Sequence, residues 1–482
     1  MIEKINAPLF QALVNHKESN PISFHVPGHK NGNVFLNSAK TLFNDLLAID
    51  VTELKGLDDL HDPQEVIKEA QTLLSEHYHT KKSYFLINGT TVGNIAMIYA
   101  TIKPGELVLV QRNCHKSIIN GLKLIGATPI FITPQIDSKT MTPTGLRHDD
   151  VITALNTYKE AKALILTNPS YYGFSQDLTA IIDSAHANQV PVLVDEAHGA
   201  HFSLNKPFPK SALQCNADIV VQSAHKTLPA MTMGSYLHIN KNSNIDVDKV
   251  ENYLKIFQSS SPSYPIMASL DLARLYLQSL TGSKIDSIVS SHHSFKKKLK
   301  RLDELIVIDN CEEGNYTIDP LKLVIQASNK ATGVSLQKQL EGQGIYTELA
   351  DTKNVLLILP LAEMKNSEEV FLRISHALKG VKAPDREVSS EENILNSNFK
   401  RISSLAISYK EMENRKVKTV SIVESKGKIA AEAIIPYPPG IPVIMPGEVI
   451  TSEMLNEINN WKDSGVRIQG KSEFNNIKVF ED

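Results

Sequence analysis

The sequence has few cysteines, no long hydrophobic run and little excess charge. Cys114, Cys215 and Cys311 are far apart and form no C-x-x-C pair. We therefore expect neither a disulfide framework nor a thiolate zinc site, and a reducing cytoplasm suits the chain. No run approaches the roughly 18 apolar residues of a membrane span, and the N-terminus lacks the apolar core of a signal peptide. We expect neither a membrane span nor secretion.

The charge balance also excludes some partners. Lysine and arginine number 50, aspartate and glutamate 53, and the net charge is −3. Nucleic acids and anionic membranes favour a strongly basic face, so we expect a small molecule or a second copy of the chain instead. The P-loop and G-x-G-x-x-G patterns are missing, which argues against a nucleotide triphosphatase and a dinucleotide enzyme.

Six short apolar runs predict the strands of a parallel sheet. They are rich in Val, Ile and Leu without polar alternation, as strands buried on both faces are. The runs are 83–88, 106–111, 128–133, 163–168, 190–195 and 218–223. Between them lie segments of helical length, at 91–102, 115–126, 149–159 and 177–189. This alternation predicts a doubly wound α/β domain.

The remaining chain predicts smaller units. A longer helical stretch is expected over about 266–305, strands over 319–327 and 354–360, and a helix near 367–379. The polar segment 382–398 is a predicted linker, and the proline-rich piece after it favours extended and turn structure. At 482 residues, two or three domains are expected. We predict an N-terminal arm (1–30), a large α/β domain (31–305), a small α/β domain (306–383) and a C-terminal domain (384–482).

Polar side chains follow five of the predicted strands. Ligands bind beyond the carboxyl ends of strands in open parallel sheets, so we expect these side chains to share one rim. The glycine and hydroxyl turn after the first strand opens a helix whose free N–H groups suit a phosphate. The polar segments are 88–94, 112–117, 167–173, 195–201 and 223–226.

These residue types match the needs of pyridoxal phosphate. A lysine on a desolvated rim can form a Schiff base with an aldehyde, and an acid nearby can keep a ring nitrogen protonated. We predict that Lys226 carries the aldehyde, that Asp195 pairs with the pyridinium, and that His115 stacks on the ring. The phosphate would lie among Thr90, Thr91, Ser223 and His225.

Two alternatives compete with this interpretation. His198 and His201, near Asp195 and Glu196, could bind a metal, but zinc sites usually show tighter, helix-borne spacing and no third ligand is evident. We expect no metal site. Alternatively, Asp195 caps a helix and Lys226 is a surface charge, which the number of converging strand ends disfavours.

Nine motifs, in their order along the chain, carry a resemblance to a known family. Five are N-G-T-T-V-G-N (88–94), R-N-C-H-K-S (112–117), T-N-P-S-Y-Y-G (167–173), D-E-A-H-G-A-H (195–201) and S-A-H-K (223–226). The others are F-H-V-P-G-H-K (24–30), E-L-K-G-L-D-D-L-H (53–61), S-S-P-S-Y-P-I-M-A-S-L-D (260–271) and P-Y-P-P-G-I-P-V-I-M-P-G-E (436–448). Together they resemble the Orn/Lys/Arg decarboxylase family of fold type I pyridoxal phosphate enzymes. The similarity is to short Gram-positive-type members without the N-terminal receiver-like domain.

The resemblance implies a fold and residue roles. It implies an aspartate-aminotransferase-like large domain with a mostly parallel sheet, followed by smaller C-terminal α+β domains. Lys226, His115, Asp195 and His198 would be catalytic, with His198 near the cofactor and the substrate carboxylate. A homodimer with shared sites is implied, in which Ser260 and Ser261 reach the neighbouring subunit's cofactor; further assembly stays open. The implied cofactor-binding residues are Gly89, Thr90, Thr91, His115, Asp195, His198, Ser223, His225, Lys226, Ser260 and Ser261.

The implied reaction is decarboxylation of a basic amino acid, with arginine favoured, then lysine or ornithine. It would yield CO₂ and agmatine or a diamine for polyamine metabolism. Glu348, Asp351 or Glu448 would meet the side-chain cation. Met233-Gly234 replaces a glutamine of some relatives and His198 a tryptophan of the long members, which leaves the substrate open. The alternatives are transamination, a retro-aldol reaction, or a non-catalytic protein that binds pyridoxal phosphate.

Overall fold

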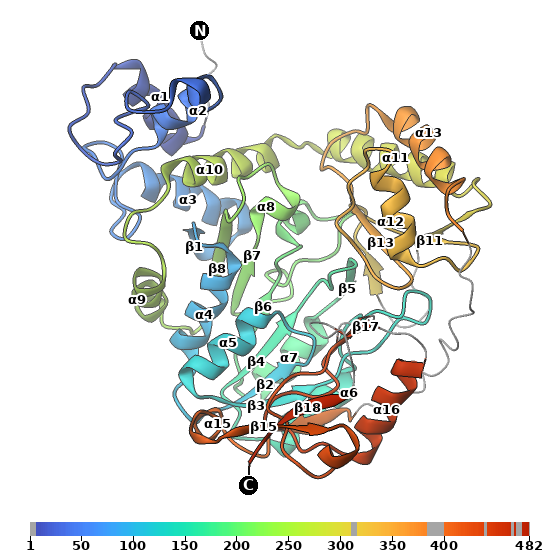
Figure 1. The fold of residues 1–482 in the computed structure, drawn as a ribbon. Coiled ribbons are helices and arrows are strands. Elements are labelled where there is room, and N and C mark those ends of the chain that lie inside the picture. The colour runs from blue at the N-terminus through green and yellow to red at the C-terminus, as the bar shows by residue number, and fades with distance from the viewer. Residues whose placement is uncertain are drawn as a thin grey trace.

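The computed structural model describes residues 6–309, 316–382, 400–437, 441–463, 467–468 and 475–481 (Figure 1). The predicted linker, from residue 383 onward, lies outside the described residues.

An eight-stranded sheet forms the centre of the molecule. Its order is β1-β8-β7-β6-β4-β2-β3-β14. Six strands run parallel, and β8 and β14 run antiparallel to their neighbours. The predicted, mostly parallel sheet is confirmed. Its strands are β1 (Thr80–Leu86), β2 (Leu107–Gln111), β3 (Thr128–Ile132), β4 (Ala163–Thr167), β6 (Val192–Asp195), β7 (Ile219–Gln222), β8 (Ser235–Asn240) and β14 (Ile402–Ser404).

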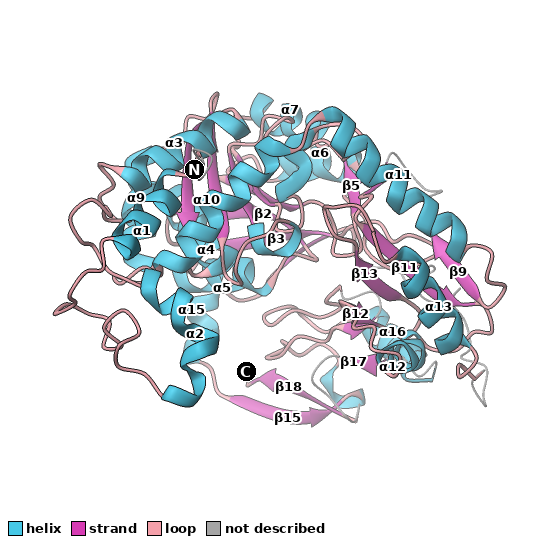
Figure 2. Cartoon of the chain, turned by 90° about the horizontal axis from the view of Figure 1, so that it is seen from above, coloured by secondary structure: helices cyan, strands magenta, loops and turns pink. Residues whose placement is uncertain are grey.

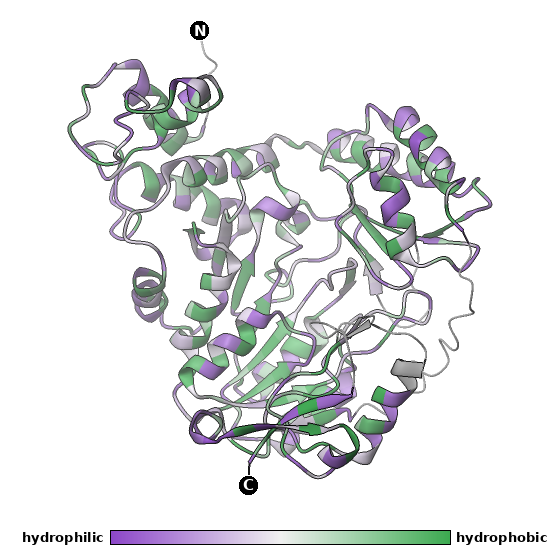
Figure 3. Ribbon diagram, viewed as in Figure 1, coloured by the Kyte–Doolittle hydropathy of each residue, from purple (hydrophilic) through white to green (hydrophobic). Residues whose placement is uncertain are grey.

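Helices cover both faces of this sheet, which explains why its strands are hydrophobic throughout (Figures 1 and 3). In β2, Leu109 enters one core while Val108 and Val110 enter the other, and all three are fully buried. One face is covered by α4 (Gly89–Thr101), α5 (Lys116–Ile125) and α9 (Val247–Phe257). The other is covered by α3 (Val66–Tyr78), α6 (His148–Thr157), α7 (Thr179–Ala187) and α10 (Tyr264–Ser279).

The predicted helix over 266–305 is two helices, α10 and α11 (Gly282–Leu299). Leu280 and Thr281 between them have extended ψ angles of 96° and 164°. Thr281 at the N-cap and Gly282, a weak helix former, explain the interruption. The break lets α10 pack on the large sheet and α11 on the second sheet.

A separate antiparallel sheet, in the order β12-β13-β11-β9, lies beside the large one (Figures 1 and 2). It contains the two strands predicted for a smaller domain. Its elements are β9 (Leu305–Ile308), β11 (Lys322–Ala327), α12 (Gly333–Glu341), β12 (Leu349–Ala350), β13 (Val355–Ile358) and α13 (Ser367–Leu378). A short pair, β5 (Phe174–Gln176) with β10 (Tyr316–Ile318), links the two parts of the chain.

The described C-terminal residues also contribute to the large sheet. In β14, Ile402 pairs with Ile132 of β3, so the segment after the predicted linker extends the large sheet at its edge. The remaining elements here are α15 (Tyr409–Asn414), β15 (Val417–Ser421), η2 (Val423–Ser425), β16 (Pro436–Tyr437), α16 (Ser452–Asp463), β17 (Arg467–Ile468) and β18 (Asn476–Phe480).

The N-terminal residues are partly packed and partly exposed. Helix α1 (Pro8–Glu18) buries Leu9 and Leu13 in the main core. Beyond it, Ile22 and Phe24 are 85% and 92% exposed, and α2 (Asn37–Ile49) exposes Leu42. The predicted domain boundaries stay predictions.

A buried ion pair joins the C-terminal segment to the large sheet. Arg112 follows β2 and makes two hydrogen bonds of 2.7 Å to the carboxylate of Glu448. Both side chains are 3% exposed. Removing one partner of such a pair leaves the other charge buried and unpaired.

We therefore expect Arg112→Met to lower the free energy of unfolding by about 3–5 kcal/mol, measured by denaturant titration. Lys17→Met removes the exposed Lys17–Asp45 pair and should cost at most about 1 kcal/mol. Equal losses in the two variants would contradict a structural role for the buried pair.

Candidate active site

A cavity of about 220 Å³ opens where the strands of the large sheet end. The residues around it come from the segments that follow five strands, so the structure brings the predicted strand ends to one rim. They include Thr90 after β1, His115 after β2, Thr167 and Tyr171 at the end of β4, Asp195 and His198 at the end of β6, and Lys226 after β7.

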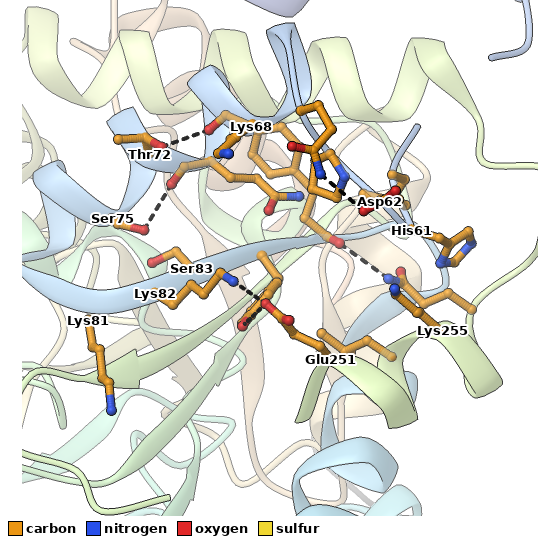
Figure 4. Close-up of a pocket in the computed structure, with 18 residues that line it drawn as sticks. His61, Asp62, Lys68, Thr72, Ser75, Lys81, Lys82, Ser83, Glu251 and Lys255 are labelled. Atoms are coloured by element: carbon orange, nitrogen blue, oxygen red, sulfur yellow. Dashed lines mark hydrogen bonds and ion pairs between the residues drawn. The ribbon is translucent and has the colours of Figure 1, made fainter. Parts of the chain in front are cut away.

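A second cavity, of about 410 Å³, lies between α3, β1 and α9 (Figure 4). Lys82 pairs there with Glu251, which also accepts a hydrogen bond of 2.9 Å from the Tyr84 hydroxyl. None of the predicted site residues lines this cavity. The candidate site is therefore the cavity at the strand ends.

Asp195 is a buried carboxylate without a cationic partner among the described residues. It ends β6, is 3% exposed, and accepts hydrogen bonds from Asn94 Nδ2 (2.9 Å) and the backbone N–H of Ala197 (3.2 Å). Burial raises its pKa, against the opposing effect of these donors and of His115 and Lys226. A cationic group in the cavity would stabilise the carboxylate.

Lys226 lies in α8 (Ala224–Thr227), a single turn after β7. Its Nζ is 3.1 Å from Nε2 of His198 and 5.7 Å from the centre of the Tyr171 ring. Burial lowers the pKa of Lys226, while Asp195 and Glu348 oppose the shift. A lowered pKa increases the fraction of unprotonated amine, the form that attacks a carbonyl.

His115 is the N-cap of α5, where its Nδ1 accepts a hydrogen bond from the backbone N–H of Ser117 (3.3 Å) and lies 2.8 Å from the Ser117 hydroxyl. This fixes the ring at the edge of the cavity. Burial lowers the pKa of His115, with Lys226 and Lys116 acting in the same direction and Asp195 against it.

The predicted phosphate residues are grouped around the start of α4. Thr90 and Ser223 have hydroxyls 3.1 Å apart, and Gly89 begins the helix at a φ of +75°, which favours glycine. Nδ1 of His225 is 3.0 Å from the carbonyl of Gly234. The backbone N–H of Gly89 donates to the Met233 carbonyl. Met233 and Gly234, the pair noted above as different from some relatives, therefore lie next to the predicted phosphate residues.

Other predicted residues lie away from the cavity. Thr91 is exposed on α4, and Ser260 and Ser261 are exposed in the loop before α10. His201 is fully buried and pairs with Asp319 at 3.0 Å, while both ring nitrogens of His198 face lysines. The geometry therefore does not favour the alternative in which His198 and His201 bind one metal ion.

Sequence reasoning gave no role to four residues of the site: Asn94, Thr167 and Tyr171 lie in predicted rim segments, and Lys322 was missed altogether. Asn94 holds Asp195 from the second turn of α4, and Tyr171 packs edge-on against His198 with ring centres 4.6 Å apart. Thr167 Oγ1 is buried beside the cavity with no hydrogen-bond partner among the described residues. Lys322, from the second sheet, reaches Nδ1 of His198 at 3.0 Å.

Comparisons with known proteins identify the family of the chain. A family model described as Orn/Lys/Arg decarboxylase, major domain, matches residues 7–313, and one for the C-terminal domain matches 390–463. The chain is 47% identical over 479 residues to the uncharacterized protein YaaO of Bacillus subtilis, covering 99% of this chain and 98% of that one. It is 32% identical over 490 residues to an arginine decarboxylase of Halalkalibacterium halodurans, covering 100% and 99%.

The fold also matches a solved structure. The crystal structure of the Francisella novicida lysine decarboxylase LdcF superposes with a TM-score of 0.82 at 22% identity, over 99% of this chain and 82% of that one. At that identity the likeness concerns the fold. The family models and the relatives show that the chain belongs to the Orn/Lys/Arg decarboxylase family, whose members depend on pyridoxal phosphate.

Proposed function

We propose that this protein decarboxylates a basic amino acid, with arginine preferred over lysine and ornithine, to give CO₂ and the corresponding amine for polyamine metabolism. The observation that carries the proposal is the pair Lys226 and Asp195 on one cavity: a partly buried amine of lowered pKa, and a buried carboxylate that forms no ion pair among the described residues. The 32% identical arginine decarboxylase supports the choice of substrate.

The residues present fit pyridoxal phosphate. Lys226 would bind its aldehyde, Asp195 would hold its ring nitrogen protonated, and His115 would cover one ring face. Gly89, Thr90, Thr91, Ser223 and His225 would surround the phosphate, and the unpartnered hydroxyl of Thr167 is free to donate to the ring substituents. When bound, the cofactor supplies a conjugated ring that takes up the electron pair left at Cα as CO₂ departs.

Two nitrogens at the cavity can return a proton to Cα. Nζ of Lys226 and Nε2 of His198 lie 3.1 Å apart, so a proton can pass between them. Tyr171, Pro169 and Tyr172 line the same cavity and would shield the reacting carbon of a bound substrate from water. These residues account for protonation of Cα within the site.

Glu348 is the best candidate for the substrate's side-chain cation. It accepts a hydrogen bond from Tyr171, which lines the cavity, and its charge acts on both Lys226 and Lys322. Asp351 instead accepts from Tyr172, Asn354 and the backbone of Lys353. The Glu448 carboxylate is paired with Arg112. Asp351 and Glu448 are therefore not available to bind a substrate in this chain.

We expect Glu348→Gln to lower kcat/KM for arginine by about 10- to 100-fold, mainly through KM, because a charge-assisted hydrogen bond contributes about 1.5–3 kcal/mol. Steady-state kinetics on the purified protein measures this. Glu341→Gln, an exposed residue of α12, should leave both constants unchanged. An unaltered KM for arginine in Glu348→Gln would contradict a role of Glu348 in substrate recognition.

The substrate is tested by incubating the holoenzyme separately with arginine, lysine and ornithine and identifying products by mass spectrometry. Agmatine in excess of cadaverine and putrescine is expected. The competing reactions differ in their products: transamination gives an α-keto acid, and a retro-aldol reaction requires a β-hydroxy substrate. A cofactor spectrum that no amino acid changes would favour a non-catalytic binding protein.

We also infer a cytoplasmic homodimer in which Ser260 and Ser261 reach the partner's cofactor. The exposed positions of both serines and the exposed side chains of Ile22, Phe24 and Leu42 support an intersubunit surface. No helix among the described residues is long and apolar enough to cross a membrane. Analytical ultracentrifugation tests the dimer and any further assembly.

A further inference from the structure

Lys322 is a buried lysine without an acidic partner. It begins β11 in the second sheet, is 0% exposed, and forms no ion pair among the described residues. The nearby carboxylate of Asp319 pairs with His201 instead. The Lys322 side chain reaches out of its own sheet to Nδ1 of His198, 3.0 Å away. Because a buried amino group without a counter-ion costs stability, this placement calls for a functional explanation.

The surroundings hold the Lys322 side chain in this position. Gly173 has a φ of +91°, and a Cβ there would lie 2.4 Å from Cγ of Lys322, so glycine leaves room for the lysine stem. The Tyr171 ring lies 6.0 Å from Nζ of Lys322. Nζ of Lys296 donates to the backbone carbonyl of Lys322 at 2.9 Å.

His198 lies between two amines, and its protonation decides how they interact. Nδ1 faces Lys322 and Nε2 faces Lys226. Burial, followed by the charges of Lys322 and Lys226, lowers the pKa of His198 well below its usual value, so the ring is neutral at pH 7. A neutral imidazole has one donor and one acceptor nitrogen.

The chemistry of Lys226 selects one of the two tautomers. Lys226 lines the cavity and must be unprotonated to attack an aldehyde, and in that form its nitrogen has a lone pair that can accept a hydrogen bond. Lys322 does not line the cavity and can stay an ammonium group. Nδ1 of His198 then accepts from Lys322, and the proton on Nε2 is donated to Lys226.

We propose that Lys322 is a positioning residue that sets the tautomer of His198; this inference rests on the proposed function. Its ammonium group makes Nδ1 the acceptor and so directs the Nε2 proton at Nζ of Lys226. The ring thereby keeps a transferable proton beside the reactive amine without adding a charge to it. Lys322 acts through His198 and does not touch the substrate.

The pH range of this effect follows from the groups around His198. They are Lys226 from α8, Lys322 from β11, Tyr171 after β4, His201 and His225, with Asp195, Glu348 and Asp319 acting on the two lysines. Burial lowers the pKa of Lys322 to about 8. Its ammonium form therefore dominates at pH 7, and the preference for the Nε2 proton should fade as the pH rises through 8.

The test is ¹⁵N NMR of histidine-labelled holoenzyme, with His198 assigned by comparison with His198→Gln. In the wild type, Nδ1 should have the shift of an unprotonated ring nitrogen and Nε2 that of a protonated one. Lys322→Met should abolish this preference. Lys322→Gln, whose amide can still donate to Nδ1, should restore it without the charge.

A second readout separates the charge from the hydrogen bond. The visible absorbance of the cofactor linked to Lys226 is titrated with pH. Loss of the nearby positive charge in Lys322→Met and Lys322→Gln should raise the midpoint by about one pH unit, and Lys322→Arg should keep it near the wild-type value.

Lys338→Met is the control. Lys338 is an exposed lysine of α12 in the same part of the chain as Lys322. Its loss should leave the His198 spectrum and the midpoint unchanged. The proposal is overturned if the wild-type proton resides on Nδ1, if Lys322→Met leaves the His198 spectrum unchanged, or if Lys338→Met alters it equally. Absence of CO₂ from every basic amino acid would contradict the proposed function alone, because the tautomer is measured independently of turnover.

Discussion

Replacing Lys226 by alanine is expected to abolish the visible absorbance of bound cofactor and to reduce decarboxylation by roughly 10³-fold or more. Lys226 contributes an unprotonated amine at the cavity, and burial lowers its pKa toward the range where that form is available. Alanine removes both the nucleophile and the nitrogen that is 3.1 Å from His198. Absorbance spectra and CO₂ release on the same preparation measure the two effects.

Lys255→Ala, an exposed lysine of α9 beside the second cavity, serves as the control and should retain both signals. The fold should survive in Lys226→Ala, because the Lys226 amine forms no ion pair among the described residues and its loss breaks none. If the visible band persists in Lys226→Ala, another amine carries the cofactor and the assignment of Lys226 is wrong.

The second large effect is expected for Asp195→Asn, which should lower kcat by about 10²- to 10⁴-fold while leaving the cofactor attached. The neutral amide keeps the size of the side chain but cannot stabilise a protonated ring nitrogen. Without its proton, the ring would accept the electron pair from Cα less readily. Attachment of the cofactor to Lys226 does not require the Asp195 carboxylate. The measurements are kcat and cofactor absorbance.

Asp195→Glu, which keeps the charge, should recover part of the lost activity. Asp218→Asn is a matched control, since Asp218 is also buried but lies at the opposite end of the same strands and pairs with His186. It should change stability more than kcat. Full activity in Asp195→Asn would show that Asp195 does not hold the ring nitrogen.

Local patterns predicted the elements that carry the site. The runs rich in Val, Ile and Leu became β2, β4, β6 and β7 because side chains of both faces are buried, and their polar ends meet because parallel strands end at one edge. Asp195 and Lys226 were predicted to lie on this rim in this way, since Asp195 ends β6 and Lys226 lies in the turn of helix after β7.

What sequence reasoning missed depends on contacts between distant segments. Lys322 lies 124 residues from His198 and begins an apolar strand with nothing local to mark it. Asn94 is inside α4, where an amide is usually without special meaning. The pairing of β14 with β3 joins residues about 270 positions apart, and no periodicity signals such a partner.

The sequence also could not decide which of three acids meets the substrate's side chain. Glu348, Asp351 and Glu448 look equivalent in sequence, yet Asp351 and Glu448 are buried and bound by protein donors. Only tertiary structure distinguishes a carboxylate that closes a turn or an ion pair from one that is free to meet a ligand.

The most direct test of the central claim uses arginine labelled with ¹³C in its carboxyl group. The holoenzyme is expected to release labelled CO₂ in one-to-one proportion to agmatine, and Lys226→Ala is expected to release neither. An α-keto acid that retains the label, or no labelled CO₂ from arginine, lysine or ornithine, would contradict decarboxylation at this site.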